Sequence, residues 1–200
     1  MSTDATSHIA GAATRSRTGS QMTLAPGSHY WKAQAKDQIW VRLQFVPQRK
    51  MEVDIWWNRL GHHPDVQLQF GLYDDFVELG CLTGNGFDNP QLQGIGFGTF
   101  AVNIAVQALK ACYPPHFKVQ GLLSNTAEAG LEPARRLHLE ANRRAFWRRF
   151  GLGVITREDP PLDFLAGQVG HLQVVPTGLL AGQFPRYVPL DEFVRDPPSS

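Results

Sequence analysis

The residues best suited to chemistry form a glycine-rich segment, residues 89–99, with the sequence Asn-Pro-Gln-Leu-Gln-Gly-Ile-Gly-Phe-Gly-Thr. Glycine permits tight turns that bring successive backbone N–H groups close to one anion. The mainly apolar stretch that follows, residues 98–111, predicts a buried helix whose N-terminus would add unpaired N–H groups. This combination favours the binding of a phosphate group. A plain connection between a strand and a buried helix remains the alternative.

Two common phosphate-binding motifs do not fit this segment. A dinucleotide fingerprint needs a third glycine where Thr99 stands and an acidic residue about 20 positions further on, near Lys118. A P-loop needs Gly-Lys followed by Ser or Thr, and the chain contains no Gly-Lys pair. The phosphate ligand must therefore belong to another class.

The chain before the glycine segment alternates apolar and polar residues, which predicts half-buried strands. The short connections between these strands predict an antiparallel meander. Only residues 46–50 separate the first strand from the second, and a His62-His63 pair, read as part of a turn, precedes the third. The four predicted strands are residues 39–45, 51–57, 66–72 and 76–83.

The chain after the glycine segment changes its period. The helix at 98–111 stops before Pro114-Pro115, a short strand follows at 117–124, and a second helix is predicted at 132–150. The fold class is therefore α/β, with a mixed sheet in which a strand meander precedes an α-β-α order. An apolar stripe on the second helix comprises Ala134, Leu137, Ala141 and Ala145, and weaker strand signals lie at 152–156 and 171–175.

The length of 200 residues suits a single domain, which we expect at residues 29–192. Residues 1–28 are rich in Ser, Thr, Ala and Gly, which predicts a disordered tail, and residues 193–200 are expected to be flexible. The net charge of +1 makes a nucleic-acid partner unlikely, and neither a membrane span nor a secretory signal is visible. With only Cys81 and Cys112, the interpretation is a cytoplasmic protein, with Cys81 in the core and no metal site.

Two motifs in order resemble those of one enzyme superfamily. The pattern Gln91-x-x-Gly94-x-Gly96 resembles the signature of the GNAT N-acetyltransferases, and residues 142–152 resemble their second signature. The resemblance covers about residues 76–152. It implies a GNAT-like acyl-CoA N-acyltransferase fold whose glycine loop cradles the pyrophosphate of acetyl-CoA or another acyl-CoA. The residues implied to bind this cosubstrate are Leu82, Gln91, Gln93, Gly94, Ile95, Gly96, Gly98, Thr99, Asn142, Arg143 and Trp147.

The same resemblance implies direct acyl transfer to an amine, whose identity is unknown, without a metal. Glu78 is the predicted general base because it shares a strand face with Gly80, which would leave a side-chain-free space beside it. Two family features are missing. Phe146 and Trp147 stand where the family often has a tyrosine acid, and no helices separate the first two strands, so the acceptor site is either rebuilt from the C-terminal region or absent.

Three functions therefore stay open from the residues. The first is an N-acyltransferase, and the second is a catalytically inactive GNAT-like module that binds a partner with or without CoA. The third uses the arginine-rich helix at 132–150 to bind nucleic acid, against which the nearly neutral net charge argues.

Overall fold

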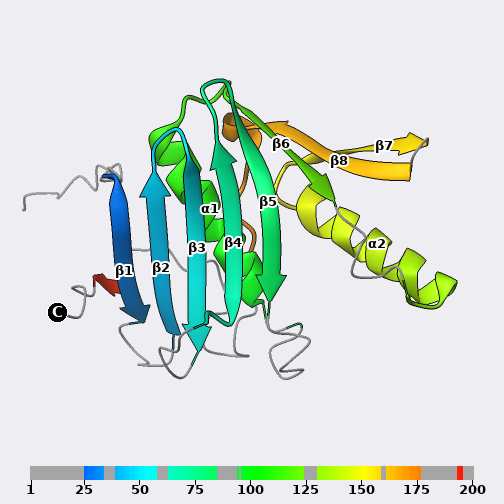
Figure 1. Ribbon diagram of the computed structural model, residues 1–200, viewed down its shortest axis with the longest axis horizontal. Coiled ribbons are helices and arrows are strands. Elements are labelled where there is room, and N and C mark those ends of the chain that lie inside the picture. Colours follow the sequence, from blue (N-terminus) through cyan, green and yellow to red (C-terminus); the bar gives the residue numbers. More distant parts are fainter. Residues whose placement is uncertain are drawn as a thin grey trace, which may run out of the picture.

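The computed structural model describes residues 25–33, 39–57, 63–84, 94, 96–123, 130–158, 161–176 and 193–195. Within them one nine-stranded sheet has the order β7-β8-β6-β5-β4-β3-β2-β1-β9, accompanied by two α-helices (Figure 1). The predicted α/β class with a mixed sheet is confirmed. The strands are β1 (Gly27–Ala33), β2 (Ile39–Val46), β3 (Lys50–Trp57), β4 (Val66–Leu72), β5 (Phe76–Gly84), β6 (Lys118–Leu123), β7 (Gly153–Glu158), β8 (Pro161–Gln168) and β9 (Phe193–Arg195), and the helices are α1 (Phe97–Cys112) and α2 (Pro133–Arg148).

Strands β2 to β5 form the predicted antiparallel meander, and β1, which was not predicted, extends it at one edge. Alternate residues of β2, from Ile39 to Phe45, are buried, and the residues between them are half-buried. The buried face packs against α1, which Figure 1 shows lying behind the meander. Because α1 is covered on most sides, it needs apolar or small residues around most of its circumference, as its sequence has.

The opposite face of the meander carries no helix among the described residues. The reason lies in the connection between β2 and β3, which is a tight turn at residues 47–49 with Gln48 at a positive φ of 53°. A turn of this length has no room for the helices that the GNAT resemblance implies between these strands. We call this side of the sheet the helix-free face.

The described sheet contains one parallel pair of strands, β5 and β6. Strand β6 pairs in parallel with β5, because α1 carries the chain back between them as a crossover. Strand β8 then lies between β6 and β7 and pairs antiparallel with both. Figure 1 shows β6, β8 and β7 diverging from the meander, with α2 beside them.

The C-terminal part of the chain differs from the sequence-based expectation. The strand predicted at 152–156 is β7, but the one predicted at 171–175 is wrong, and the sequence analysis missed β8. Leu172 and Val175 are buried without forming a strand, because they point from an irregular segment into the core. The segment expected to be flexible includes β9, which pairs with β1 at the sheet edge, and β1 itself begins inside the predicted tail.

The apolar stripe predicted on α2 does not pack against the core. Ala134, Leu137, Ala141 and Ala145 are exposed, and Leu137 retains 63% of its accessible surface. The helix packs mainly through its last turn, where Trp147 is the buried residue. Its N-terminal turns project past the sheet in Figure 1. Ala145 lies in the same last turn as Trp147 but about 200° away around the helix, so the stripe faces away from the core.

Candidate functional site

Strands β5 and β6 separate after a short ladder, and the interval between them, which we call the opening, lies near some of the predicted site residues, among them Glu78, Leu82 and Gly98. The parallel ladder runs only from the pair Phe76–Lys118 to the pair Leu79–Gly121. Beyond it, β5 continues to Gly84 paired with β4 alone, while β6 pairs with β8. The two strands diverge in Figure 1, so the facing edge of β5 has no strand partner among the described residues.

A β-bulge lies in β5 where this ladder ends. Leu82 pairs with Leu68, but Leu79 pairs with Phe70, so Gly80 and Cys81 together face Gln69. A Cβ added at Gly80 would stand 2.9 Å from the carbonyl oxygen of Gln69. A larger residue at Gly80 would therefore collide with β4. The free space predicted beside Gly80 is occupied, on the β4 side, by the backbone of Gln69. Cys81 is exposed, so its predicted place in the core is wrong; the bulge breaks the alternation that the prediction assumed.

The glycine loop reaches the start of α1 beside this edge of β5. Gly94 and Gly96 have φ values of 78° and 103°, a conformation that side chains strongly disfavour. Gly96 is the N-cap of α1 and offers no side-chain cap, and the first turn contains no acidic residue. A Cβ at Gly98 would lie 3.6 Å from Leu82, and Thr99 is buried. An uncapped helix start next to left-handed glycines suits an anion.

Three of the predicted loop residues, Gln91, Gln93 and Ile95, lie outside the described residues. One residue near the helix start escaped the sequence analysis. The ring of Trp57 lies 5.9 Å from that of Phe97, the first residue of α1, and its indole Nε1 is buried without a hydrogen-bond partner in the described structure. Such an orphan donor is costly, by about 1–3 kcal/mol. The sequence held no signal for it beyond an aromatic residue at a strand end.

Glu78 lies exposed on the helix-free face, opposite Gly71 of β4 and Gln120 of β6. The hydroxyl of Tyr73 donates a hydrogen bond of 3.1 Å to its Oε2. This hydrogen bond raises the pKa of Tyr73, because it favours the protonated phenol. The carboxylate of Glu78 is therefore held towards Tyr73 in the turn before β5, and Glu78 itself stands one residue before the last pair of the β5–β6 ladder.

The residues of the second signature do not lie together: Asn142 is on the surface and Trp147 is in the core. Asn142 is exposed, with its Nδ2 3.0 Å from Nε2 of His138. Trp147 is only 5% exposed, and its ring packs against those of Phe146 and Phe150, with centroid distances of 5.1 and 6.3 Å. The structure thus places Trp147 in the hydrophobic core and not at the opening, because a large apolar ring gains most from burial.

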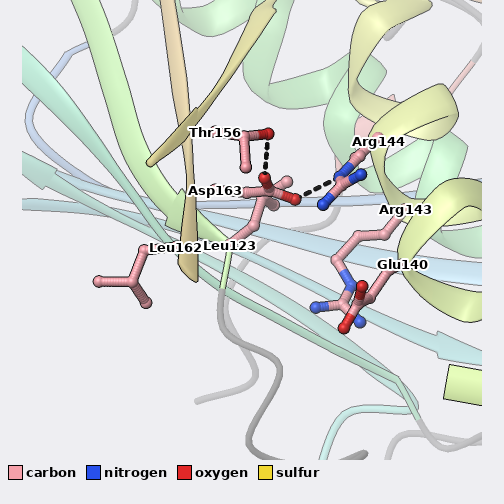
Figure 2. Close-up of a pocket in the computed structure, with 7 residues that line it drawn as sticks. All are labelled: Leu123, Glu140, Arg143, Arg144, Thr156, Leu162 and Asp163. Atoms are coloured by element: carbon pink, nitrogen blue, oxygen red, sulfur yellow. Dashed lines mark hydrogen bonds and ion pairs between the residues drawn. The ribbon is translucent and has the colours of Figure 1, made fainter. Parts of the chain in front are cut away.

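Arg143 lines a small charged pocket between α2 and the β6-β8-β7 strands, shown in Figure 2. The pocket encloses about 60 Å³. Arg144 is paired with Asp163, which also accepts a 2.7 Å hydrogen bond from the hydroxyl of Thr156. Burial alone would raise the pKa of Asp163, but the hydrogen bonds from Arg144 and Thr156 outweigh it, and its pKa is lowered. Arg144 therefore ties α2 to the β7–β8 hairpin. The remaining lining residues are Leu123, Glu140 and Leu162.

A second polar network, absent from the sequence analysis, lies on the helix-free face. Nε2 of Gln67 donates to both Glu52 and Asp54, at 2.6 and 2.9 Å, and Arg42 donates to Asp54 at 2.7 Å. Asp54 is fully buried, and this burial raises its pKa against the opposing effect of the Gln67 and Arg42 hydrogen bonds. The alternating sequence of β3 shows which face these carboxylates take, but their burial depends on neighbouring strands.

Among the described residues no cluster of histidine, cysteine or acidic side chains could hold a metal ion. No described helix is both long and apolar enough to cross a membrane. Comparison with known proteins found no matching family model and no significantly similar curated protein or solved structure.

Proposed function

We propose that this protein is an acyl-CoA-dependent N-acyltransferase of the GNAT type, which transfers an acyl group, most simply acetyl, directly to an amine. The observation that carries the proposal is the conjunction at one strand end. The ladder between parallel strands β5 and β6 stops at Leu79–Gly121, a bulge follows in β5, and the first turn of α1, which comes directly after the left-handed glycines 94 and 96, approaches Leu82 at Gly98. A plain connecting loop would not need all three features in one place.

Each feature has a role in this function. The uncapped start of α1 and the loop with Gly94 and Gly96 would hold the pyrophosphate through backbone N–H groups. The pantetheine arm would lie along the unpaired edge of β5, where backbone groups past Leu79 can hydrogen-bond to its amides. A backbone N–H near the bulge would polarise the thioester carbonyl, as the family resemblance implies.

Glu78 would take the proton of the acceptor amine. Its carboxylate is exposed, borders the opening and is held by Tyr73, so it can reach an amine on the helix-free face. The departing thiolate would leave without a side-chain acid on α2, because Trp147 is buried and cannot donate a proton to it. This makes deprotonation of the amine the step on which the protein's own residues act most.

The alternative is a module that binds acyl-CoA without transferring the acyl group. The burial of Trp147 and the lack of a tyrosine in α2 favour it. The two functions share the CoA site and differ only in turnover.

The test is calorimetric titration and thermal unfolding with acetyl-CoA, CoA, NAD⁺ and NADP⁺. Acetyl-CoA at one hundred times its Kd should stabilise the fold by about 2.7 kcal/mol, whereas the dinucleotides should have no effect. Absence of any shift with millimolar acetyl-CoA would contradict the proposal. Thioester consumption with a panel of amines then separates the enzyme from the binding module.

A further inference from the structure

A row of apolar side chains crosses the helix-free face beside the opening. Leu122 of β6 pairs with Phe164 of β8, which in turn pairs with Ile155 of β7, so the three side chains lie next to one another. Leu122 and Ile155 retain 50% and 57% of their accessible surface. The guanidinium of Arg157 lies over the ring of Phe164, 4.9 Å from its centroid, so the row is most open at its two ends. Single exposed apolar residues are common, but apolar residues exposed side by side are a feature of binding surfaces. We call these three residues the apolar row.

The apolar row begins at the opening itself. Leu79 and Gly121 form the last pair of the parallel ladder, so the next residues along the two strands are Gly80 and Leu122. Leu122 is thus the first side chain of β6 beyond the ladder on the helix-free face. It lies across the opening from the bulge of β5, on the same face as Glu78.

The other side of the opening is polar. Gln69 of β4 faces the bulge, and its Nε2 lies 3.4 Å from Oε1 of Glu52 on β3, which is only 6% exposed. Glu52 is already paired with Lys50, whose Nζ lies 3.0 Å from its Oε2, so it is the exposed carboxylate of Glu78 that can attract a cationic group on this side. The β6-β8-β7 side offers the exposed apolar side chains of Leu122 and Ile155. The helix-free face therefore changes from polar to apolar at the opening.

We propose that the acceptor is an amine with an apolar substituent, which packs on the apolar row while its amino group faces Glu78. This inference rests on the proposed acyl transfer and names its acceptor class. Two features argue for such an occupant: the charge complementarity between an ammonium group and Glu78, and the continuity of the row with the opening. The acceptor surface is then rebuilt on β7 and β8, in place of the helices missing between β2 and β3.

The chemistry balances without a further reactant. Glu78 removes one proton from the ammonium group, and the neutral nitrogen attacks the thioester carbonyl carbon. A C–N bond forms, the C–S bond breaks, and the CoA thiolate leaves as the amide is released. The proton that the amide nitrogen loses converts the thiolate to free CoA thiol.

The experiment compares two acceptors with the same five-carbon chain, pentylamine and 5-aminopentan-1-ol, with acetyl-CoA. Burial of the alkyl end should give pentylamine about a ten-fold higher kcat/KM, carried mainly by KM. The double variant Leu122→Thr/Ile155→Thr keeps strand-forming residues and should bring this ratio close to one, with unchanged acetyl-CoA affinity. Leu137→Thr makes the same kind of change at an exposed leucine of α2 and should leave the ratio as it is.

Equal kcat/KM for the two amines in the wild type, or an unchanged ratio in the double variant, would overturn the inference while leaving the acyltransferase intact. If acetyl-CoA binds but no amine turns over, calorimetric binding of pentylamine to the CoA complex decides, and no binding overturns it. Failure of acetyl-CoA itself to bind removes the proposed function and this inference together. A dimer that Ile155→Lys converts to monomer in sedimentation would assign the apolar row to a second copy of the chain instead.

Discussion

The hydroxyl of Tyr73 donates a hydrogen bond of 3.1 Å to Oε2 of Glu78 across the turn that joins β4 to β5. The ring of Tyr73 also stacks on Phe76, with centroids 4.5 Å apart, so the donor is held in position. The hydrogen bond raises the pKa of Tyr73, so the phenol remains a donor to a higher pH than a free tyrosine would. Tyr73 is therefore a positioning residue for the carboxylate proposed as the base.

Glu78→Gln should lower turnover by about ten- to ten-thousand-fold, because the amide cannot accept the amine proton. Acetyl-CoA affinity should change by no more than about a few-fold, since Glu78 lies outside the predicted phosphate contacts. Tyr73→Phe keeps the base and should cost much less. Thioester consumption from pH 6 to 9.5 measures both, and equal rates for wild type and Glu78→Gln would remove Glu78 from the mechanism.

Gly96→Val should abolish the stabilisation by acetyl-CoA, because a side chain at φ 103° would occupy the phosphate's place beside the α1 start. Backbone strain alone lowers the free energy of unfolding by about 1–3 kcal/mol, so a matched control is needed. Gly27 has a similar φ of 123° and open space around it. Gly27→Val should lose comparable stability and keep the full acetyl-CoA shift in thermal unfolding. A normal shift in Gly96→Val would show that the loop is placed wrongly.

The two neighbouring arginines of α2 should separate binding from stability. Arg144→Ala breaks the ion pair with Asp163 and should lower the free energy of unfolding by about 1–3 kcal/mol, with acetyl-CoA affinity unchanged. Arg143→Ala should instead weaken acetyl-CoA binding, as the resemblance implies. Exposed Arg135→Ala is the control for a general loss of positive charge. Calorimetry and urea unfolding of the three variants provide the measurement.

The buried amide of Asn103 should matter more for stability than any exposed amide. Its Nδ2 donates to the carbonyl of Val175 and its Oδ1 accepts from the N–H of Val175, both at 2.8 Å. Asn103→Ala leaves both backbone groups without partners and should lower the free energy of unfolding by about 2–5 kcal/mol. Exposed Asn142→Ala should change it by less than about 0.5 kcal/mol. Equal losses in urea unfolding would contradict the C-terminal segment's docking on α1.

Asp54 and Asp163 should respond to pH in opposite directions. The folded-state pKa of Asp54 is raised, so its charge destabilises the native state at neutral pH, and this penalty lessens as pH falls through the folded pKa towards the unfolded value of about 3.9. The pKa of Asp163 is lowered, so its contribution is complete above about pH 4 and is lost below it.

The measurement is the free energy of unfolding of Asp54→Asn and Asp163→Asn relative to wild type, between pH 3.5 and 7. Wild type should gain stability relative to Asp54→Asn as pH falls from 7 towards 4. The deficit of Asp163→Asn should instead be largest near pH 7 and shrink below about pH 4. Parallel curves for the two variants would show that one of the assigned environments is wrong.

The sequence by itself determined strands β2 to β5, both main helices and the short strand between them, because each shows a local periodicity of apolar residues. The alternation of apolar and polar residues from 39 to 45 matches the alternation of buried and half-buried residues in β2. Helix α1 begins and ends within one residue of its predicted bounds. The left-handed glycines 94 and 96 were also visible locally, since no other residue takes that conformation readily.

Only the tertiary structure decided what depends on contacts between distant segments. The burial of Glu52 and Asp54 depends on side chains of β2 and β4. The exposure of Cys81 depends on the register shift opposite Gln69. The exposure of the apolar stripe on α2 depends on how that helix lies against the sheet. The apolar row joins three strands whose residues are separated by up to 42 positions, from Leu122 to Phe164. Local sequence carries no record of which strands become neighbours, because pairing is settled by the packing of the whole sheet on α1 and α2.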